Sequence, residues 1–165
     1  MKIIVVGGGQ VGSTIVEALH GEHTLTVIDV EAALLESLAH GYDVITLHGN
    51  GASRAVLQEA GVKDADLLIA CTSRDEINII ASMLARLLAP RTKTIVRTSN
   101  RDYLEAWQEH HLDVDFTVSS EQEAAYAVWR IIGVPAALET EVFADGQVQI
   151  VEFDVHREIR PGIVG

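Results

Sequence analysis

Short apolar runs alternate with segments whose apolar residues recur at helical spacing along most of this chain. Six runs predict strands, because each is rich in β-branched residues and bounded by turn formers; they span 2–7, 25–30, 42–49, 65–72, 93–98 and 114–118. The segments with helical spacing predict helices at 11–20, 32–40, 55–60, 77–88, 103–110 and 121–133. Strict alternation, with strands apolar on both faces, predicts an α/β, doubly wound (Rossmann) six-stranded parallel sheet with helices on both faces.

The pattern changes after Val134-Pro135 to alternating polar and apolar positions. Asp145-Gly146 is a strong hairpin turn, so residues 138–155 predict two antiparallel strands. A lone hairpin is marginally stable in water. This chain would then be a piece of a longer polypeptide, or its hairpin would pack on a partner.

The predicted helix at 77–88 is apolar nearly all round, which a helix covered on one face by a sheet does not need. Its apolar residues favour a contact with another subunit over burial inside this chain. The stretch "AAYAVWRIIG" from Ala124 suggests the same, with Trp129 as a candidate anchor. Two capping boxes, Ser73 with Glu76 and Ser120 with Glu123, predict helix starts.

Composition narrows the function classes. The 165 residues carry a net charge of -12 and are 48% hydrophobic, which fits one well-buried domain. The acidic balance opposes binding to nucleic acid and to anionic lipid. Cys71 is the single cysteine, so no intramolecular disulfide forms. We find no membrane span and no signal peptide, and expect a soluble cytoplasmic chain with no direct membrane insertion.

Three glycines between the first strand and the first helix form G-x-G-x-x-G. In this pattern Gly7 permits the tight turn, Gly9 lets a pyrophosphate approach the backbone, and Gly12 lets helix and strand pack closely. The amides from Gln10 to Gly12 begin the helix and would face the phosphates. The motif predicts a nucleotide or dinucleotide ligand.

Asp29 ends the second strand, where an acid accepts hydrogen bonds from an adenosine ribose. An alternative role is to cap the helix that follows Glu31, and both roles are compatible. An acid here without a neighbouring arginine disfavours a 2'-phosphate. We therefore expect NAD(H) or an adenine nucleotide rather than NADP(H).

Other candidate positions follow the third, fourth and fifth strands. The segment "HGNGAS" at 48–53 either lies against a ligand or forms a plain turn in which Ser53 caps a helix. Thr72 and Ser73 follow the fourth strand at the same sheet edge. Arg97 ends the fifth, and either contacts phosphate or forms an internal salt bridge, because a guanidinium is costly to bury alone.

Catalytic patterns are missing from the sequence. We find no metal-ligand spacing, no Ser, His and Asp set, no Tyr-x-x-x-Lys relay and no substrate domain. A dehydrogenase needs a proton donor beside the nicotinamide. We expect no enzyme activity and no metal, with an NAD-dependent oxidoreductase or its cofactor-binding fragment as the alternative. A second and weaker alternative is a dimerisation module whose nucleotide site has decayed.

Four runs carry a family resemblance: "VVGGGQVGSTIVEAL", "TVIDV", "LHGNGASRAVLQEAGVKDADLLIACTSRDEINIIA" and "IVRTSNRDYL". Over residues 1–135 they resemble the N-terminal nucleotide-binding lobe of TrkA-type regulators of bacterial Trk potassium uptake systems. More broadly they are similar to RCK (KTN) domains. The resemblance implies a first domain over 1–135 and a hairpin over 136–165 that begins a truncated, small α+β C-terminal lobe. Gln10 matches the Trk-type form, whereas Ktr-type regulators carry an arginine there.

The resemblance implies a nucleotide sensor that gates potassium uptake through a Trk-type membrane transporter, with no chemistry on the ligand. It implies NAD(H) as the ligand, with ATP or ADP as the alternative, and a homodimer or higher oligomer held at the inner face of the membrane through the transporter. The binding residues that it implies are Gly7, Gly9, Gln10, Val11 and Gly12 at the phosphates, Asp29 at the ribose, Asn50, Gly51 and Ala52 near adenosine, and Thr72, Ser73 and Arg97 near the distal phosphate or second nucleoside.

Overall fold

The computed structural model describes residues 1–133, 139–143 and 148–152. It divides into two compact units, Met1–Ser120 and Glu121–Gly165. The predicted lobes at 1–135 and 136–165 stay a prediction.

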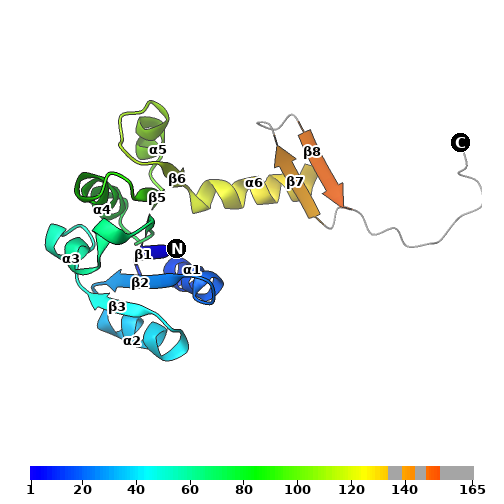
Figure 1. Cartoon of the computed structure of the whole chain (residues 1–165). Coiled ribbons are helices and arrows are strands. Elements are labelled where there is room, and N and C mark those ends of the chain that lie inside the picture. The colour runs from blue at the N-terminus through cyan, green and yellow to red at the C-terminus, as the bar shows by residue number, and fades with distance from the viewer. Residues whose placement is uncertain (134–138, 144–147, 153–165) are drawn as a thin grey trace, which may run out of the picture. The chain divides into compact units, whose positions relative to one another are not determined.

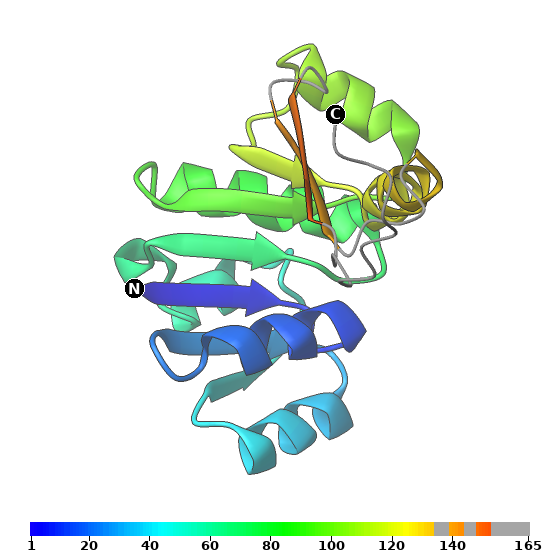
Figure 2. The ribbon, with the colours of Figure 1, turned by 90° about the vertical axis from the view of Figure 1, so that its right-hand side faces the viewer.

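The first unit is built on a six-stranded sheet with the order β3-β2-β1-β4-β5-β6. All neighbouring strands in it are parallel, and Val5 at the centre pairs with both Val27 and Ile69. The arrows of β1 and β4 run in the same direction in Figure 2. The strands are β1 (Lys2–Val6), β2 (Thr24–Asp29), β3 (Ile45–His48), β4 (Leu67–Ala70), β5 (Lys93–Arg97) and β6 (Phe116–Val118). The predicted doubly wound fold is confirmed.

Helices connect successive strands, as Figure 1 shows. All six predicted helices are present, and a short 3-10 turn after α3 is one element that periodicity did not predict. Gly61, with φ of 80°, starts that turn in the left-handed region. The elements are α1 (Gln10–Leu19), α2 (Ala32–Gly41), α3 (Arg54–Glu59), η1 (Val62–Asp64), α4 (Asp75–Leu88), α5 (Arg101–Gln108) and α6 (Ser120–Gly133).

Two hydrophobic cores lie on opposite faces of the sheet, because alternate side chains of a strand point to opposite faces. On one face, Ile3 and Val5 of β1 pack with Val16 of α1 and Leu35 of α2. On the other, Ile4 and Val6 join residues of α3 and α4, among them Leu57, Ala81 and Ala85. The central strands are buried on both faces, which explains why they are apolar without alternation.

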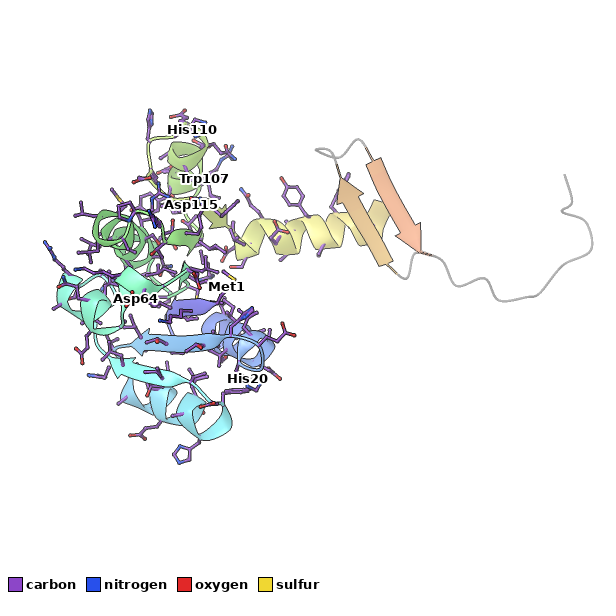
Figure 3. The ribbon with its side chains drawn as sticks, in the orientation of Figure 1. Met1, His20, Asp64, Trp107, His110 and Asp115 are labelled. Atoms are coloured by element: carbon purple, nitrogen blue, oxygen red, sulfur yellow. The ribbon has the colours of Figure 1, made fainter. Side chains whose placement is uncertain are left out.

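A cluster of charged side chains holds the start of β6 against β5 and α4. Asp115, before β6, accepts from Arg86 of α4 at 2.9 Å and from Lys93 of β5 at 3.0 Å. Trp107 of α5 donates its indole N–H to the Val114 carbonyl at 2.9 Å, next to Asp115 (Figure 3). Burial acts to raise the pKa of Asp115, but Lys93, Thr94 and Arg86 together hold it below the ordinary value.

The first predicted capping box is wrong. Helix α4 begins at Asp75, with Arg74 in the N-cap position and no side-chain cap. The hydroxyl of Thr72 instead accepts from the Arg74 amide at 3.2 Å. At the second predicted box, α6 begins at Ser120, whose hydroxyl accepts from Nε of Arg97 at 2.9 Å.

The second unit contains most of α6 and a two-stranded antiparallel sheet. Strands β7 (Glu139–Phe143) and β8 (Val148–Glu152) pair so that Phe143 faces Val148. These are the two strands that alternation predicted. The predicted turn at Asp145-Gly146 and Pro135 lie outside the described residues.

Apolar side chains remain exposed on both candidate contact helices. On α4, Ile80, Met83 and Leu87 are exposed, Leu87 to 72%, although Ile79 on the same helix is buried. On α6, Trp129 is 63% exposed, and Tyr126, Val128 and Ile132 are also exposed. The helix at 77–88 is therefore not fully buried by the described chain. The subunit contact that we expect there stays a prediction.

Candidate functional site

A cavity of about 570 Å³ opens at the carboxyl ends of β1, β2, β3, β4 and β5. This is the edge at which doubly wound sheets bind ligands. Ten of the twelve predicted binding residues line it: Gly7, Gly9, Gln10, Val11, Asp29, Asn50, Gly51, Thr72, Ser73 and Arg97. Gly12 and Ala52 are not among the lining residues. Ligand contact by any of the twelve stays a prediction.

The glycine turn after β1 depends on the absence of side chains. Gly7 has φ of 109°, which L residues rarely adopt, and a Cβ there would come within 2.9 Å of the Thr72 amide nitrogen. A Cβ at Gly12 would overlap the Gly7 carbonyl oxygen, so Gly12 serves the packing of α1 against β1. A Cβ at Gly9 would meet nothing within 4 Å. Gly9 is thus the glycine whose missing side chain leaves open space in the cavity.

The carboxylate of Asp29 joins the ends of β1 and β2. One oxygen accepts from the Gly8 amide at 2.6 Å, and the other accepts from the Glu31 amide at 2.9 Å. Helix α2 has Glu31 in its N-cap position and no side-chain cap, so Asp29 does not cap it. Asp29 instead fixes the glycine turn against β2 and keeps lone pairs at the cavity wall.

The segment after β3 forms a turn against the same edge. The side chain of Asn50 accepts from the Ala52 amide at 2.9 Å, which closes an Asx turn. A Cβ on Gly51 would overlap the Val6 side chain, so this backbone lies directly on β1. Ser53 occupies the N-cap position of α3 but makes no side-chain cap. The segment therefore forms the predicted turn, but without the predicted cap from the Ser53 side chain. Asn50 and Gly51 also line the cavity, and contact of this segment with a ligand stays a prediction.

Asn78 of α4 organises the turn after β4, and sequence reasoning missed it. The side chain is 0% exposed. Its oxygen accepts from the Thr72 amide at 2.9 Å and from the Thr72 hydroxyl at 2.6 Å. Its amide nitrogen donates to the carbonyls of Thr72 at 3.0 Å and Arg97 at 2.9 Å. One asparagine therefore holds the ends of β4 and β5 together and uses its full hydrogen-bonding capacity.

Asp75, three residues earlier, ties α4 to the end of β5. Its carboxylate accepts from the Thr98 hydroxyl at 2.9 Å, the Ser99 amide at 2.9 Å and the Asn100 amide at 2.7 Å. Burial acts to raise the pKa of this carboxyl, but these hydrogen bonds outweigh burial and hold it below the ordinary value. Asp75 is thus an anion that serves the fold.

Arg97 lies at the cavity but is engaged by the protein. Its Nε donates to the Ser120 hydroxyl at 2.9 Å, and one terminal nitrogen donates to the Thr72 carbonyl at 3.2 Å. Much of this guanidinium is therefore held at the base of the β4 turn. A phosphate contact and an internal salt bridge were the two alternatives for Arg97, and neither is decided by these bonds.

Cys71 is buried between the two turns. Its thiol donates to the Gly7 carbonyl at 3.6 Å, and burial raises its pKa to about 11. A thiol with this pKa stays protonated at neutral pH and is a poor nucleophile.

The cavity also contains lining residues that the sequence did not single out, notably Glu31, Arg74 and Ile77. They carry no motif, since their place at the cavity follows from the turns before α2 and α4. The acidic residues Asp29 and Glu31 line the cavity on the β2 side. Both arginines among the described lining residues, Arg74 and Arg97, lie on the β4–β5 side. The site is therefore polarised along the sheet edge.

No group of three or more His, Cys, Asp or Glu residues that could hold a metal occurs in the described part of the chain. Within the same residues, no helix is long and apolar enough to cross a membrane.

Comparison with known proteins identifies the family. Residues 3–120 match the TrkA-N domain. The chain belongs to the TrkA-N domain family. The match covers the first unit from residue 3 onward and every residue that lines the cavity, and it confirms the resemblance seen in the sequence.

Curated relatives of this TrkA-N chain are named after potassium uptake. Trk system potassium uptake protein trkA homolog 1 of Methanosarcina mazei is 35% identical over 166 residues, which cover 96% of this chain and 40% of the relative. The Trk system potassium uptake protein TrkA of Halomonas elongata is 38% identical over 155 residues, covering 92% of this chain and 34% of the relative. The chain thus spans 34% to 40% of the length of these relatives.

Solved structures share the fold. The TrkA-N domain of inner membrane protein ybaL from Escherichia coli has a TM-score of 0.72 at 24% identity, covering 79% of this chain and 96% of that one. The Shewanella denitrificans Kef CTD in its AMP bound form has a TM-score of 0.67 at 21% identity, covering 81% and 82%. The GsuK channel bound to NAD has 0.67 at 18% identity, covering 87% and 25%. At these identities the likeness concerns the fold alone.

Proposed function

We propose that this TrkA-N chain is a nucleotide-sensing regulatory domain that controls potassium uptake through a Trk-type membrane transporter. It binds NAD(H), with ATP or ADP as the alternative, and performs no chemistry on the ligand. The domain acts on the cytoplasmic side, where it joins the transporter as a homodimer or higher oligomer. The binding residues are the twelve named from the sequence, with Gly12 acting through packing.

One observation carries the proposal: ten of the twelve residues, from five separate strand ends, line one cavity. Asp29 lies at the β2 side for a ribose, and open backbone at Gly9 lies at β1 for phosphate. Among solved structures with the same fold, one is bound to NAD and another to AMP. Curated relatives are named for Trk potassium uptake.

The cavity supports sensing rather than turnover. Its thiol is protonated at neutral pH, and the carboxylate of Asp29 is already bound by two backbone amides. A bound nucleotide would touch the turns after β1, β2 and β4 together. Differential binding to two arrangements of these turns is the physical means by which a ligand shifts a conformational equilibrium.

The test is calorimetric titration of the chain with NAD, NADH, NADPH, ATP and ADP, repeated on Asp29→Asn. We expect NADH, NAD or an adenosine phosphate to bind more tightly than NADPH, because Asp29 and Glu31 repel a 2'-phosphate. Asp29→Asn should lower the affinity for the best ligand about tenfold, since charge-assisted hydrogen bonds to the ribose are weakened.

Asp43→Asn is the matched control, because Asp43 is exposed and outside the cavity. It should leave every affinity unchanged. Tightest binding of NADPH would overturn the assignment of Asp29. Absence of binding by all five nucleotides would overturn the proposed function.

A further inference from the structure

Arg74 and Arg97 are the cationic side chains at the β4–β5 side of the cavity, and they differ in what already binds them. Arg97 donates to Ser120 and to the Thr72 carbonyl. The described residues offer the Arg74 guanidinium no hydrogen bond or ion pair, although its backbone amide is fixed by the Thr72 hydroxyl at 3.2 Å. Arg74 therefore combines a fixed backbone with an exposed, available cation.

The acids next to Arg74 in sequence are committed elsewhere. Asp75 takes the hydroxyl and amide donors of residues 98–100. Glu76 accepts from the Tyr103 hydroxyl at 3.4 Å. Neither carboxylate forms an ion pair with Arg74, which is exposed and lines the cavity.

The strand order gives this charge a position. Asp29 ends β2 and Arg74 follows β4, with β1 and its glycine turn between them. Neighbouring strands are about 4.8 Å apart, so the two strand ends lie roughly 10 Å from one another. A nucleotide whose ribose lies at Asp29 and whose first phosphates lie at Gly9 would bring any further phosphate towards Arg74.

We propose that Arg74 is the residue that selects the ligand by its terminal charge. Its guanidinium makes the β4 side an anion subsite, which favours nucleotides ending in a phosphate, such as ADP and ATP, over adenosine and over NAD(H), whose second end is a nucleoside. The inference rests on the proposed function, takes ATP or ADP from the two kinds of ligand named there in place of NAD(H), and names the specificity-determining residue of that site.

The experiment compares the affinities of adenosine, AMP, ADP, ATP and NADH for the chain and for Arg74→Gln by calorimetry, without magnesium so that the phosphates keep their charge. Affinity should rise along the series from adenosine to ATP in the unsubstituted chain. Arg74→Gln should reduce the ratio of ATP to adenosine affinity about tenfold while leaving adenosine unchanged. Arg74→Lys should restore part of the ratio, because the charge remains without the planar guanidinium.

Arg91→Gln is the matched control, an exposed arginine before β5 at the opposite edge of the sheet. It should leave the ratio unchanged. Raising the salt concentration should reduce the ratio more in the unsubstituted chain than in Arg74→Gln, because screening weakens exposed charge pairs.

Two results would overturn the inference while the proposed function stands: nucleotides bind but Arg74→Gln leaves the ratio unchanged, or the substitution weakens adenosine and ATP by the same factor. Failure of every nucleotide to bind the unsubstituted chain would instead overturn the proposed function itself. The melting temperature of Arg74→Gln should match that of the unsubstituted chain, since the side chain is exposed.

Discussion

The turns after β1 and β4 lie side by side at one sheet edge, yet they are built in opposite ways. The β1 turn is shaped by missing side chains, because Gly7 and Gly12 bring backbone against backbone. The β4 turn is shaped by buried polar side chains, because Asn78 and Asp75 bind the backbone of β4 and β5 ends. The first turn offers space and amides to a ligand, and the second supplies a rigid wall.

Gly12→Ala tests the β1 turn and should have the largest effect. Its new methyl group would overlap the Gly7 carbonyl oxygen, a backbone atom that cannot move alone. We expect a loss of about 3 kcal/mol or more in the free energy of unfolding, measured by urea denaturation. Gly9→Ala is the matched control, with a change below about 1 kcal/mol, because its methyl group meets no atom.

The same pair separates folding from binding. Gly9→Ala should fold and yet weaken nucleotide binding, since its methyl group would occupy the space proposed for phosphate. Equal stability of Gly12→Ala and Gly9→Ala would show that the β1 turn does not depend on close backbone packing.

Asn78→Ala tests the β4 turn. It leaves buried backbone groups of Thr72 and Arg97 without their partners and opens a small void. We expect a loss of about 2 to 3 kcal/mol in the free energy of unfolding by urea denaturation. Asn100→Ala, which removes the N-cap of α5, is the control and should lose about 1 kcal/mol.

Asn78→Asp separates shape from bonding in the same turn, because it keeps the size and the acceptor but replaces the two donations by repulsion between oxygens. It should be destabilised like Asn78→Ala. A stability equal to that of the unsubstituted chain would contradict the role given to the amide nitrogen.

Asp75 gives the β4 turn a dependence on pH. Since its pKa is lower in the folded chain, its contribution to stability is full above the ordinary aspartate pKa of 3.8 and is lost as the pH falls below that value. Urea midpoints measured between about pH 6 and pH 3 should fall less steeply for Asp75→Asn than for the unsubstituted chain.

At neutral pH, Asp75→Asn should lose about 1 kcal/mol, because an amide cannot accept from three donors as a carboxylate does. Asp43→Asn, at an exposed position, should reproduce the slope of the unsubstituted chain. A slope for Asp75→Asn as steep as that of the unsubstituted chain would contradict the pKa direction assigned to Asp75.

Ser82, one turn beyond Asn78 on α4, should have the smallest effect. Its hydroxyl is buried without a hydrogen-bond partner among the described residues. Ser82→Ala should change the free energy of unfolding by less than about 0.5 kcal/mol, or stabilise the chain, because no bond is lost and a desolvated hydroxyl is removed. A loss above 1 kcal/mol, measured by urea denaturation, would be the contrary result.

The sequence was sufficient for the sheet and for the β1 turn. Local periodicity of apolar residues predicts the strands and helices, and Gly7, Gly9 and Gly12 belong to one short motif. Asp29 was predictable because its distance from the glycines is set by one helix and one strand.

The β4 turn was only partly predictable. Thr72 and Ser73 were placed at the correct edge, but a local capping box was expected where Arg74 precedes the helix without a cap. Asn78 bonds to Arg97 and Asp75 bonds to Asn100, pairs far apart in the sequence whose contact exists only after β4 and β5 have paired. No local pattern marks such bonds, and none marks Glu31 or Arg74 as residues that line the cavity.

Cys71, between these two turns, makes opening of the sheet edge measurable. The chain has one cysteine, which lies at the cavity wall with only 7% of its surface exposed, and its thiol is protonated at neutral pH. Alkylation of this thiol therefore requires local opening of the sheet edge, and the alkylation rate reports how often the edge opens. A ligand that contacts both turns would lower the rate of Cys71 alkylation, and this rate would therefore report how tightly the sheet edge is closed.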